Sequence, residues 1–205
     1  MMAPGVSLNA MLPFHFGFSD AEPEVPGLRL IPDFMTPDEE AVLLASLDSQ
    51  PWRNDLQRRV QHYGYRYDYK ARQVTPALRL GALPSWLGVW AEKVHQDGFF
   101  GYQPDQVIVN EYQPGQGIAP HIDCVPCFGD TIASLSLGSG CIMDFVHDAT
   151  KTKRSSFLPP RSLLILQGDA RYHWQHGIAK RLYDTIAGAR LPRQRRVSLT
   201  FRKVL

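Results

Sequence analysis

Two segments in the first half of the chain carry the pattern of amphipathic helices. In "TPDEEAVLLASL", residues 36–47, a threonine and a proline precede a glutamate three positions after the threonine, which predicts a capped helix start with a capping box. Apolar residues then recur at helical spacing through Leu43 and Leu47. A second helix is predicted to follow Pro84, because apolar residues such as Trp90 recur there at the same spacing.

The second half of the chain is a series of short β-type segments separated by turn residues. Seven are predicted: "QVIVNEY", "TIASLSL", "CIMDFVH", "SSFLP", "RSLLILQG", "RYHWQHGI" and "RRVSLTFRKV". An earlier segment, "RRVQHYGYRYDYKAR" at 58–72, alternates in polarity and predicts a strand or hairpin. Helices followed by many strands predict an α+β domain whose sheet is rolled into a jelly-roll-like shell backed by the helices.

Length and composition are those of one globular domain. The chain has 205 residues, of which 44% are hydrophobic and 20% charged, so a disordered or fibrous protein is excluded. No apolar run approaches the length needed to span a bilayer, and the first residues lack a basic leader. Three cysteines are too few for a disulfide framework. We therefore expect a cytoplasmic domain over residues 26–205, with residues 1–25 as a tail.

Basic residues are concentrated in two places, although the net charge is only +2. Residues 53–79 hold seven basic and two acidic side chains, with tyrosines interleaved among them, and residues 190–205 hold six basic side chains and no acidic one. Basic patches mixed with aromatic rings suit a polyanion whose bases can stack. The alternative, an ordinary solvated surface, stays open.

The segment "VNEYQPGQGIAPHIDCVPC", residues 109–127, holds a candidate metal site. His121 and Asp123 are separated by one residue, so on a strand they point the same way and can bind one cation. We expect His176 in "HWQHGI" as the third ligand and prefer it to His173, because the following Gly177 would let the chain approach the ion. Two histidines and one carboxylate form the facial set of non-haem Fe(II) oxygenases. The alternative is an aspartate that caps a turn beside a surface histidine.

The last predicted strand suggests an anion site. Arg196 and Arg202 lie on one face of "RRVSLTFRKV", with Cα atoms on the order of 20 Å apart at the strand rise. If that face lines a shell, the two guanidinium groups need anionic partners, and a short dicarboxylate could bridge them. Asn110 and Tyr112 share a face of their own strand and could add neutral hydrogen bonds. The alternative is an amphipathic strand with its arginines in water.

Together, "NEYQPGQGIAPHID", "HGI" and "RRVSLTFR" resemble the AlkB family of Fe(II)/2-oxoglutarate-dependent dioxygenases. The resemblance implies a double-stranded β-helix (jelly-roll) core over about 103–205. It implies that Fe(II) is bound by His121, Asp123 and His176, and that 2-oxoglutarate is bound by Asn110, Tyr112, Arg196 and Arg202. The implied reaction uses O2 to demethylate or hydroxylate an alkylated or modified base in nucleic acid.

Within that family the chain looks most similar to the tRNA-modifying AlkB homologues and a bacterial subgroup like them. Val125 stands where repair-type members carry an acidic residue, which favours RNA over repair of alkylated DNA. The resemblance also implies a nucleotide-recognition lid at about 53–79, where Tyr63 and Tyr65 stack on a base. The expected phosphate contacts of that lid come from Arg59 and Lys70. We expect a monomer, with a separate methyltransferase as a possible partner.

Three other functions stay open at this point. The chain could be a repair demethylase of alkylated DNA, a hydroxylase of the same fold acting on a protein or small molecule, or a nucleic-acid binder without catalysis. The pair Cys124 and Cys127 allows a structural zinc, a redox pair or plain loop cysteines.

Overall fold

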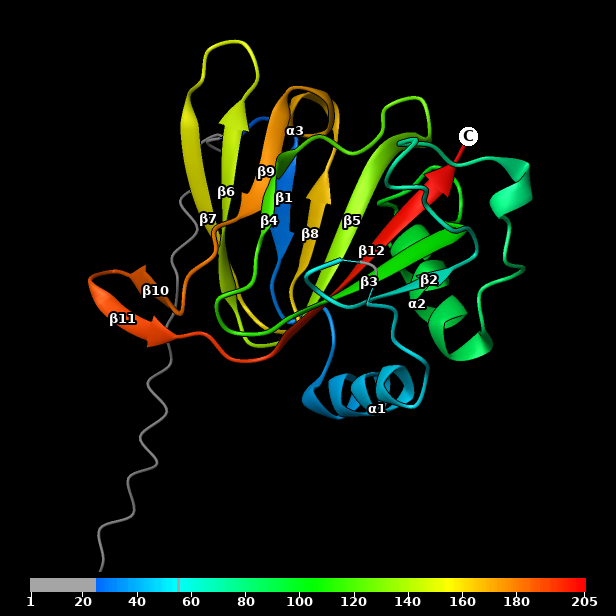
Figure 1. Cartoon of the computed structure of the whole chain (residues 1–205), viewed down its shortest axis with the longest axis horizontal. Coiled ribbons are helices and arrows are strands. Elements are labelled where there is room, and N and C mark those ends of the chain that lie inside the picture. The colour runs from blue at the N-terminus through cyan, green and yellow to red at the C-terminus, as the bar shows by residue number, and fades with distance from the viewer. Residues whose placement is uncertain (1–24, 55) are drawn as a thin grey trace, which may run out of the picture.

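A computed structural model describes residues 25–54 and 56–205, and its described part is built around two antiparallel sheets (Figure 1). The six-stranded sheet has the order β1-β8-β5-β12-β3-β2 and the four-stranded sheet the order β4-β9-β6-β7. The strands of the first sheet are β1 (Leu28–Ile31), β8 (Leu163–Leu166), β5 (Phe128–Gly138), β12 (Arg196–Val204), β3 (Gln106–Tyr112) and β2 (Val60–Tyr63). Those of the second are β4 (Ile118–His121), β9 (Trp174–Ile178), β6 (Cys141–His147) and β7 (Lys153–Leu158). A separate hairpin joins β10 (Tyr183–Ile186) to β11 (Ala189–Pro192).

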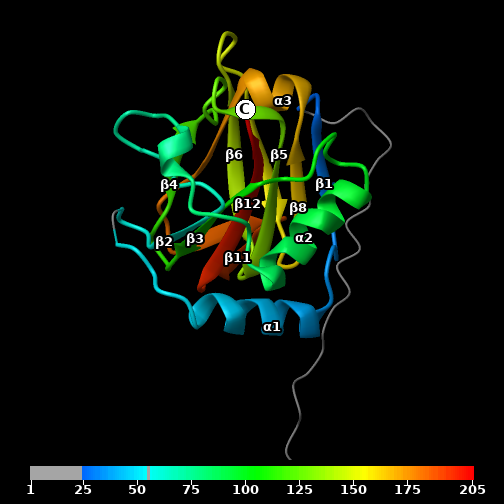
Figure 2. The same cartoon turned by 90° about the vertical axis from the view of Figure 1, so that its right-hand side faces the viewer.

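The two predicted helices cover the six-stranded sheet on the face away from the second sheet (Figure 2). Helix α1 (Pro37–Asp48) begins with the expected capping box between Thr36 and Glu39, and helix α2 is Ser85–Gln96. A short 3₁₀ helix η1 (Pro76–Leu78) precedes α2. Leu43 and Leu47 are buried against the outward-facing apolar side chains of β3, β5, β8 and β12. Both helix predictions are confirmed.

A second hydrophobic core lies between the two sheets, and a cavity lies beside it. Alternate residues of one strand point to opposite sides, so Val197 and Leu199 join the helix-side core while Arg196 and Ser198 face inward. The core between the sheets is packed by Tyr112 and by residues of β5, β6, β8 and β9. This arrangement confirms the predicted α+β class and jelly-roll core.

Several local predictions were incomplete. Strands β1, β4, β10 and β11 were not foreseen, because each has only four residues and too little alternation to show in the sequence. The predicted strand over 171–178 begins only at Trp174, since the chain first forms the short helix α3 (Gly168–Tyr172), which starts at the positive φ of Gly168.

The expected tail at 1–25 lies outside the described residues apart from Val25, which is buried. No helix of the described chain is long and apolar enough to cross a membrane.

Candidate metal and anion site

Strands β4 and β9 bring the two candidate histidines side by side. His121 and His176 are paired residues in the antiparallel register, and their ring centroids lie 4.5 Å apart. The strands approach closely because Gly177 has no side chain: a Cβ there would lie 2.9 Å from the Pro120 backbone nitrogen. The glycine after His176 thus serves a different purpose from the one expected, since it makes room for β4.

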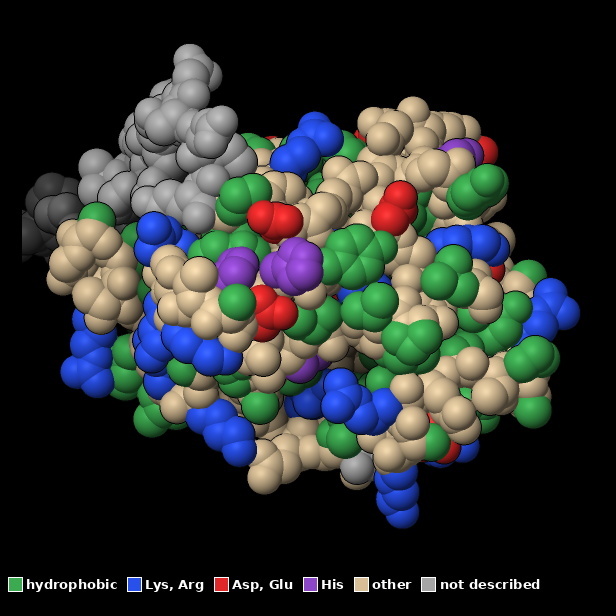
Figure 3. Space-filling model, turned by 90° about the horizontal axis from the view of Figure 1, so that it is seen from above, with side chains coloured by type: hydrophobic (Ala, Val, Ile, Leu, Met, Phe, Trp, Pro, Cys, Tyr) green, Lys and Arg blue, Asp and Glu red, His purple; other side chains and the backbone are tan. Residues whose placement is uncertain are grey.

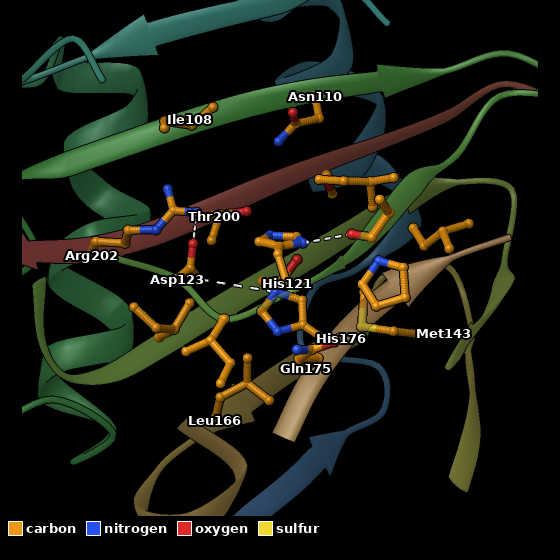
Figure 4. A pocket seen from close by; sticks show the side chains of 18 of the residues that line it. Ile108, Asn110, His121, Asp123, Met143, Leu166, Gln175, His176, Thr200 and Arg202 are labelled. Carbon is orange, nitrogen blue, oxygen red and sulfur yellow. Dashed lines mark hydrogen bonds and ion pairs between the residues drawn. The ribbon is translucent and has the colours of Figure 1, made fainter. Parts of the chain in front are cut away.

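Asp123 follows β4 and points toward the same place (Figure 4). Its Oδ2 lies 4.0 Å from Nε2 of His176, and its Oδ1 accepts a 2.9 Å hydrogen bond from Nη2 of Arg202. Oδ2 is buried and has no hydrogen-bond partner among the described residues. Burial alone would raise the pKa of Asp123, but its charged neighbours, the Arg202 guanidinium foremost, lower it below its usual value. The carboxylate is therefore ionised, with one oxygen available to a cation.

Both imidazoles are suited to bind a metal. Nδ1 of His121 lies 2.9 Å from the carbonyl oxygen of Ala119 and donates to it, so Nε2 is the nitrogen on the side available to a metal. Burial, with a smaller contribution from His121, lowers the pKa of His176 to about 3, so its ring is neutral at neutral pH. Among residues 25–54 and 56–205, no three His, Cys, Asp or Glu side chains lie close enough together to form a complete metal site. The orphaned Oδ2 of Asp123 and the two adjacent imidazoles nevertheless fit a facial cation site.

The predicted anion residues line the same cavity, whose volume is about 640 Å³. In the register, Tyr112 is opposite Arg196 and Asn110 is opposite Ser198, so these side chains share the inner face. Arg196 is 3% exposed and donates from Nη2 to Ser136 at 2.9 Å, while its Nε and Nη1 are buried with no partner among the described residues. A buried guanidinium with two free donors is costly unless an anion binds there.

The expected substrate residues lie elsewhere. The side chain of Arg59 is hydrogen-bonded to Glu111, on the opposite face of β3 from Asn110. Tyr63 packs edge-on against Trp86 with ring centroids 5.5 Å apart, which is the hairpin-packing role that the sequence left open.

Tyr65 and Lys70 are also outside the cavity. Tyr65 lies in an isolated bridge with Arg79, and Lys70 is exposed. Strand β2 ends at Tyr63, and the φ of +75° at Gly64 turns the chain there, so Tyr63 and Tyr65 do not point into the cavity. Contacts of these four residues with a nucleic acid stay a prediction.

The lid side chains that do line the cavity are Arg58, Tyr67, Tyr69 and Arg72. Tyr67 and Tyr69 contact each other at 5.1 Å between ring centroids, and Tyr67 also lies 6.0 Å from the ring of Phe128. Gly64 is the sequence signal for the end of the strand, and it points to Tyr67 and Tyr69 as the candidates for base stacking.

The loop after Asp123 is held by two features that the sequence did not reveal. Cys124 and Cys127 form a disulfide with Cα atoms 5.3 Å apart, so neither the zinc nor the free-loop interpretation describes them. Arg171 of α3 is 2% exposed and donates to the carbonyl oxygens of Asp123, Cys124, Phe128 and Gly129. The rival ligand His173 lies 3.7 Å from Asp148 on the surface, away from the cavity.

Comparisons with known proteins show the family of the chain. Residues 27–202 match the family model of the 2OG-Fe(II) oxygenase superfamily. The chain is 42% identical over 208 residues to "Alkylated DNA repair protein ALKBH8 homolog" of Arabidopsis thaliana, covering 90% of this chain and 60% of that one. It is 38% identical over 200 residues to "tRNA (carboxymethyluridine(34)-5-O)-methyltransferase alkbh8" of Xenopus tropicalis, covering 87% of this chain and 32% of that one.

Among solved structures, that of OsALKBH1 matches with a TM-score of 0.61 and 19% identity, covering 87% of this chain and 97% of that chain. At this identity the likeness concerns the fold alone. The chain spans about three fifths of the length of the Arabidopsis relative and about a third of the length of the Xenopus relative.

Proposed function

Because the chain belongs to the AlkB family within the 2OG-Fe(II) oxygenase superfamily, we propose that it oxidises an alkylated or modified base of a nucleic acid, with RNA and tRNA favoured. It is an Fe(II)/2-oxoglutarate-dependent dioxygenase, and its cofactors and cosubstrates are Fe(II), 2-oxoglutarate and O2. The observation that supports the site assignment best is the meeting of His121, His176 and the unpartnered oxygen of Asp123 in one cavity.

In this proposal His121, Asp123 and His176 bind the iron, and the inner face of β12 with its neighbour β3 binds the diacid. Arg196 binds the distal carboxylate with its two unpartnered nitrogens, beside the ring of Tyr112. Arg202, which is hydrogen-bonded to Asp123, binds with Asn110 the end of the diacid nearest the metal. When bound, iron and 2-oxoglutarate supply the oxidising power that inserts oxygen into a substrate C–H bond. The protein's own side chains orient the cosubstrates and exclude water.

The nucleic-acid assignment is supported by the relatives and by the lid. The names of the two relatives describe repair of alkylated DNA and methylation of a tRNA uridine. Tyr67 and Tyr69 line the cavity, and aromatic rings in that position can stack on a base that has left its helix. The segment 53–79 acts as the lid, with these tyrosines rather than Tyr63 and Tyr65 against the base.

RNA is favoured over DNA because the Xenopus relative is named for a tRNA uridine, and Val125 leaves no carboxylate at a position where the DNA-repair pattern has one. We propose that a methyltransferase acts on the same tRNA, because the Xenopus relative is named as a tRNA methyltransferase. The chain would act as a monomer in this scheme.

The test is oxidation of a defined pool of nucleic acids. Total tRNA and alkylated single-stranded DNA are incubated anaerobically with protein, Fe(II) and 2-oxoglutarate, oxygen is admitted, and the digested nucleosides are compared by mass spectrometry. The proposal predicts an altered tRNA nucleoside together with succinate, and neither product with the His121→Ala variant. Altered DNA alone would identify a repair demethylase. Failure to change either polymer would contradict a nucleic-acid substrate and leave a protein or small-molecule hydroxylase.

A further inference from the structure

Arg58 is a third guanidinium group at the cavity that neither the metal nor the diacid accounts for. Its Nε donates a 2.8 Å hydrogen bond to Oδ1 of Asn110, and its Cζ lies 5.8 Å from the centroid of the Tyr112 ring. Arg58 is one of the residues that line the cavity. The terminal nitrogens of this guanidinium make no hydrogen bond or ion pair with any described residue. The fork that binds an oxyanion is therefore free.

The backbone around Arg58 is fixed on both sides. The carbonyl of Gln57 accepts from Nε2 of Gln116 at 2.9 Å, and the carbonyl of Arg59 accepts from the backbone nitrogen of Glu111 at 3.0 Å. Arg59 forms a salt bridge with Glu111 on the outer side of β3, whereas Arg58 points into the cavity. A long side chain anchored at its backbone and at its Nε presents its fork in a defined place, which lowers the entropy cost of binding.

The charges of the cavity leave an excess of positive charge after the cosubstrate binds. Among the described residues that line the cavity, four arginines face one carboxylate: the arginines are Arg58, Arg72, Arg196 and Arg202, and the carboxylate belongs to Asp123. The two charges of Fe(II) balance the two of the diacid, so the surplus from the protein remains. A cleft with this charge and apolar walls attracts a further anion. Figure 3 shows Lys and Arg side chains grouped near the centre of one face, next to a histidine.

We propose that Arg58 binds an oxyanion of the substrate itself, either the phosphate beside the target nucleotide or a carboxylate carried by the target base. This inference rests on the proposed function. Arg58 belongs to the lid beside Tyr69, whereas the cosubstrate arginines belong to β12, so the substrate and the cosubstrate have separate guanidinium groups. A guanidinium binds phosphate and carboxylate alike through two parallel N–H donors. Arg58 thereby holds the target nucleotide at the cavity.

The experiment measures binding rather than turnover, under anaerobic conditions with Fe(II) and 2-oxoglutarate present. The probes are four versions of one single-stranded RNA oligomer with a single uridine. One is unmodified, two carry a neutral methylphosphonate linkage on the 5′ or the 3′ side of that uridine, and one carries 5-carboxymethyluridine. Fluorescence anisotropy compares wild-type protein with Arg58→Met, which keeps the length, and Arg58→Lys, which keeps the charge. Arg66→Met removes an exposed charge of the same segment outside the cavity and serves as the control.

Arg58→Met is expected to weaken binding about tenfold only where the relevant anion is present, the order of one charge-assisted hydrogen bond. If the affinity loss of Arg58→Met disappears with one of the methylphosphonate probes, Arg58 binds the phosphate at that position. If the affinity loss occurs only with the 5-carboxymethyluridine probe, Arg58 binds the carboxylate of the base. Arg58→Lys should retain part of the affinity, and Arg66→Met should weaken all four probes by a similar small factor.

An equal loss on every probe, or no loss on any, overturns the assignment while leaving the proposed function intact. Wild-type protein that binds none of the four oligomers overturns both. A change in 2-oxoglutarate affinity alone would mean that Arg58 belongs to the cosubstrate site.

Discussion

Replacing Gly177 with alanine should separate the two metal-binding histidines. A Cβ at this position would lie 2.9 Å from the backbone nitrogen of Pro120 and 3.0 Å from the carbonyl oxygen of Ile118, whereas ordinary contacts begin near 3.4 Å. Both neighbours are backbone atoms of the β4 region, so the strand itself must move away by about 0.4–0.5 Å. Since His121 is on β4 and His176 is on β9, that movement acts directly on the ligand geometry.

The expected cost is about 1–3 kcal/mol of folding stability for overpacking, reduced by about 0.5 kcal/mol because alanine restricts the unfolded chain. Displaced ligands should weaken Fe(II) binding about tenfold or more. Anaerobic calorimetry gives the metal affinity and urea unfolding gives the stability. Gly88→Ala is the matched control, because nothing lies within 4 Å of the added Cβ in the middle of α2. That control should be stabilised by about 0.5–1 kcal/mol. Wild-type iron affinity and stability in Gly177→Ala would refute the reasoning.

Three further predictions follow from buried charges. Arg171→Leu should cost about 2–4 kcal/mol in urea unfolding, because four carbonyl oxygens of the loop after Asp123 lose their donor; a loss below about 0.5 kcal/mol would show that water replaces it. Arg196→Met should raise the KM for 2-oxoglutarate about tenfold or more, measured as succinate formed, and an unchanged KM would remove this residue from the diacid site. Glu111→Gln should cost about 1–2 kcal/mol at neutral pH, since Glu111 pairs with Arg59 and Arg195. Burial raises the pKa of Glu111, but the hydrogen bonds with the two arginines lower it further, so that its pKa in the folded protein is below the usual glutamate value. The stability that the ion pairs contribute is therefore present above the usual glutamate pKa and is lost as the pH falls through the pKa of the folded protein. The difference between wild type and variant should therefore shrink below about pH 4, and a difference independent of pH would contradict the ion pair.

Features that depend on strand alternation could be predicted from the sequence. The spacing of Arg196 and Arg202 assigns both side chains to one face of β12 without knowledge of the partner strands. The His-x-Asp spacing brought His121 and Asp123 together as candidates, although Asp123 lies just beyond the end of β4. The structure brings all four to one cavity. The helix at 37–48 was equally accessible, because a capping box is a local pattern.

Features that depend on the path of a loop could not be predicted. Tyr63 and Tyr67 have the same parity, and only the turn at Gly64 separates the packed ring from the cavity ring. Arg171 has carbonyl oxygens as partners, and these leave no trace in a sequence. The disulfide of Cys124 and Cys127 could not be predicted either, because a Cys-x-x-Cys pair is compatible with a zinc site, a redox pair or free cysteines.

The central claim is that one metal ion is bound by His121, Asp123 and His176. Anomalous diffraction from crystals grown anaerobically with Mn(II) and 2-oxoglutarate tests it most directly. The account predicts one anomalous peak within about 2.0–2.3 Å of a nitrogen of each histidine and an oxygen of Asp123. A metal bound at His173, or a peak that lacks any one of the three ligands, would contradict it.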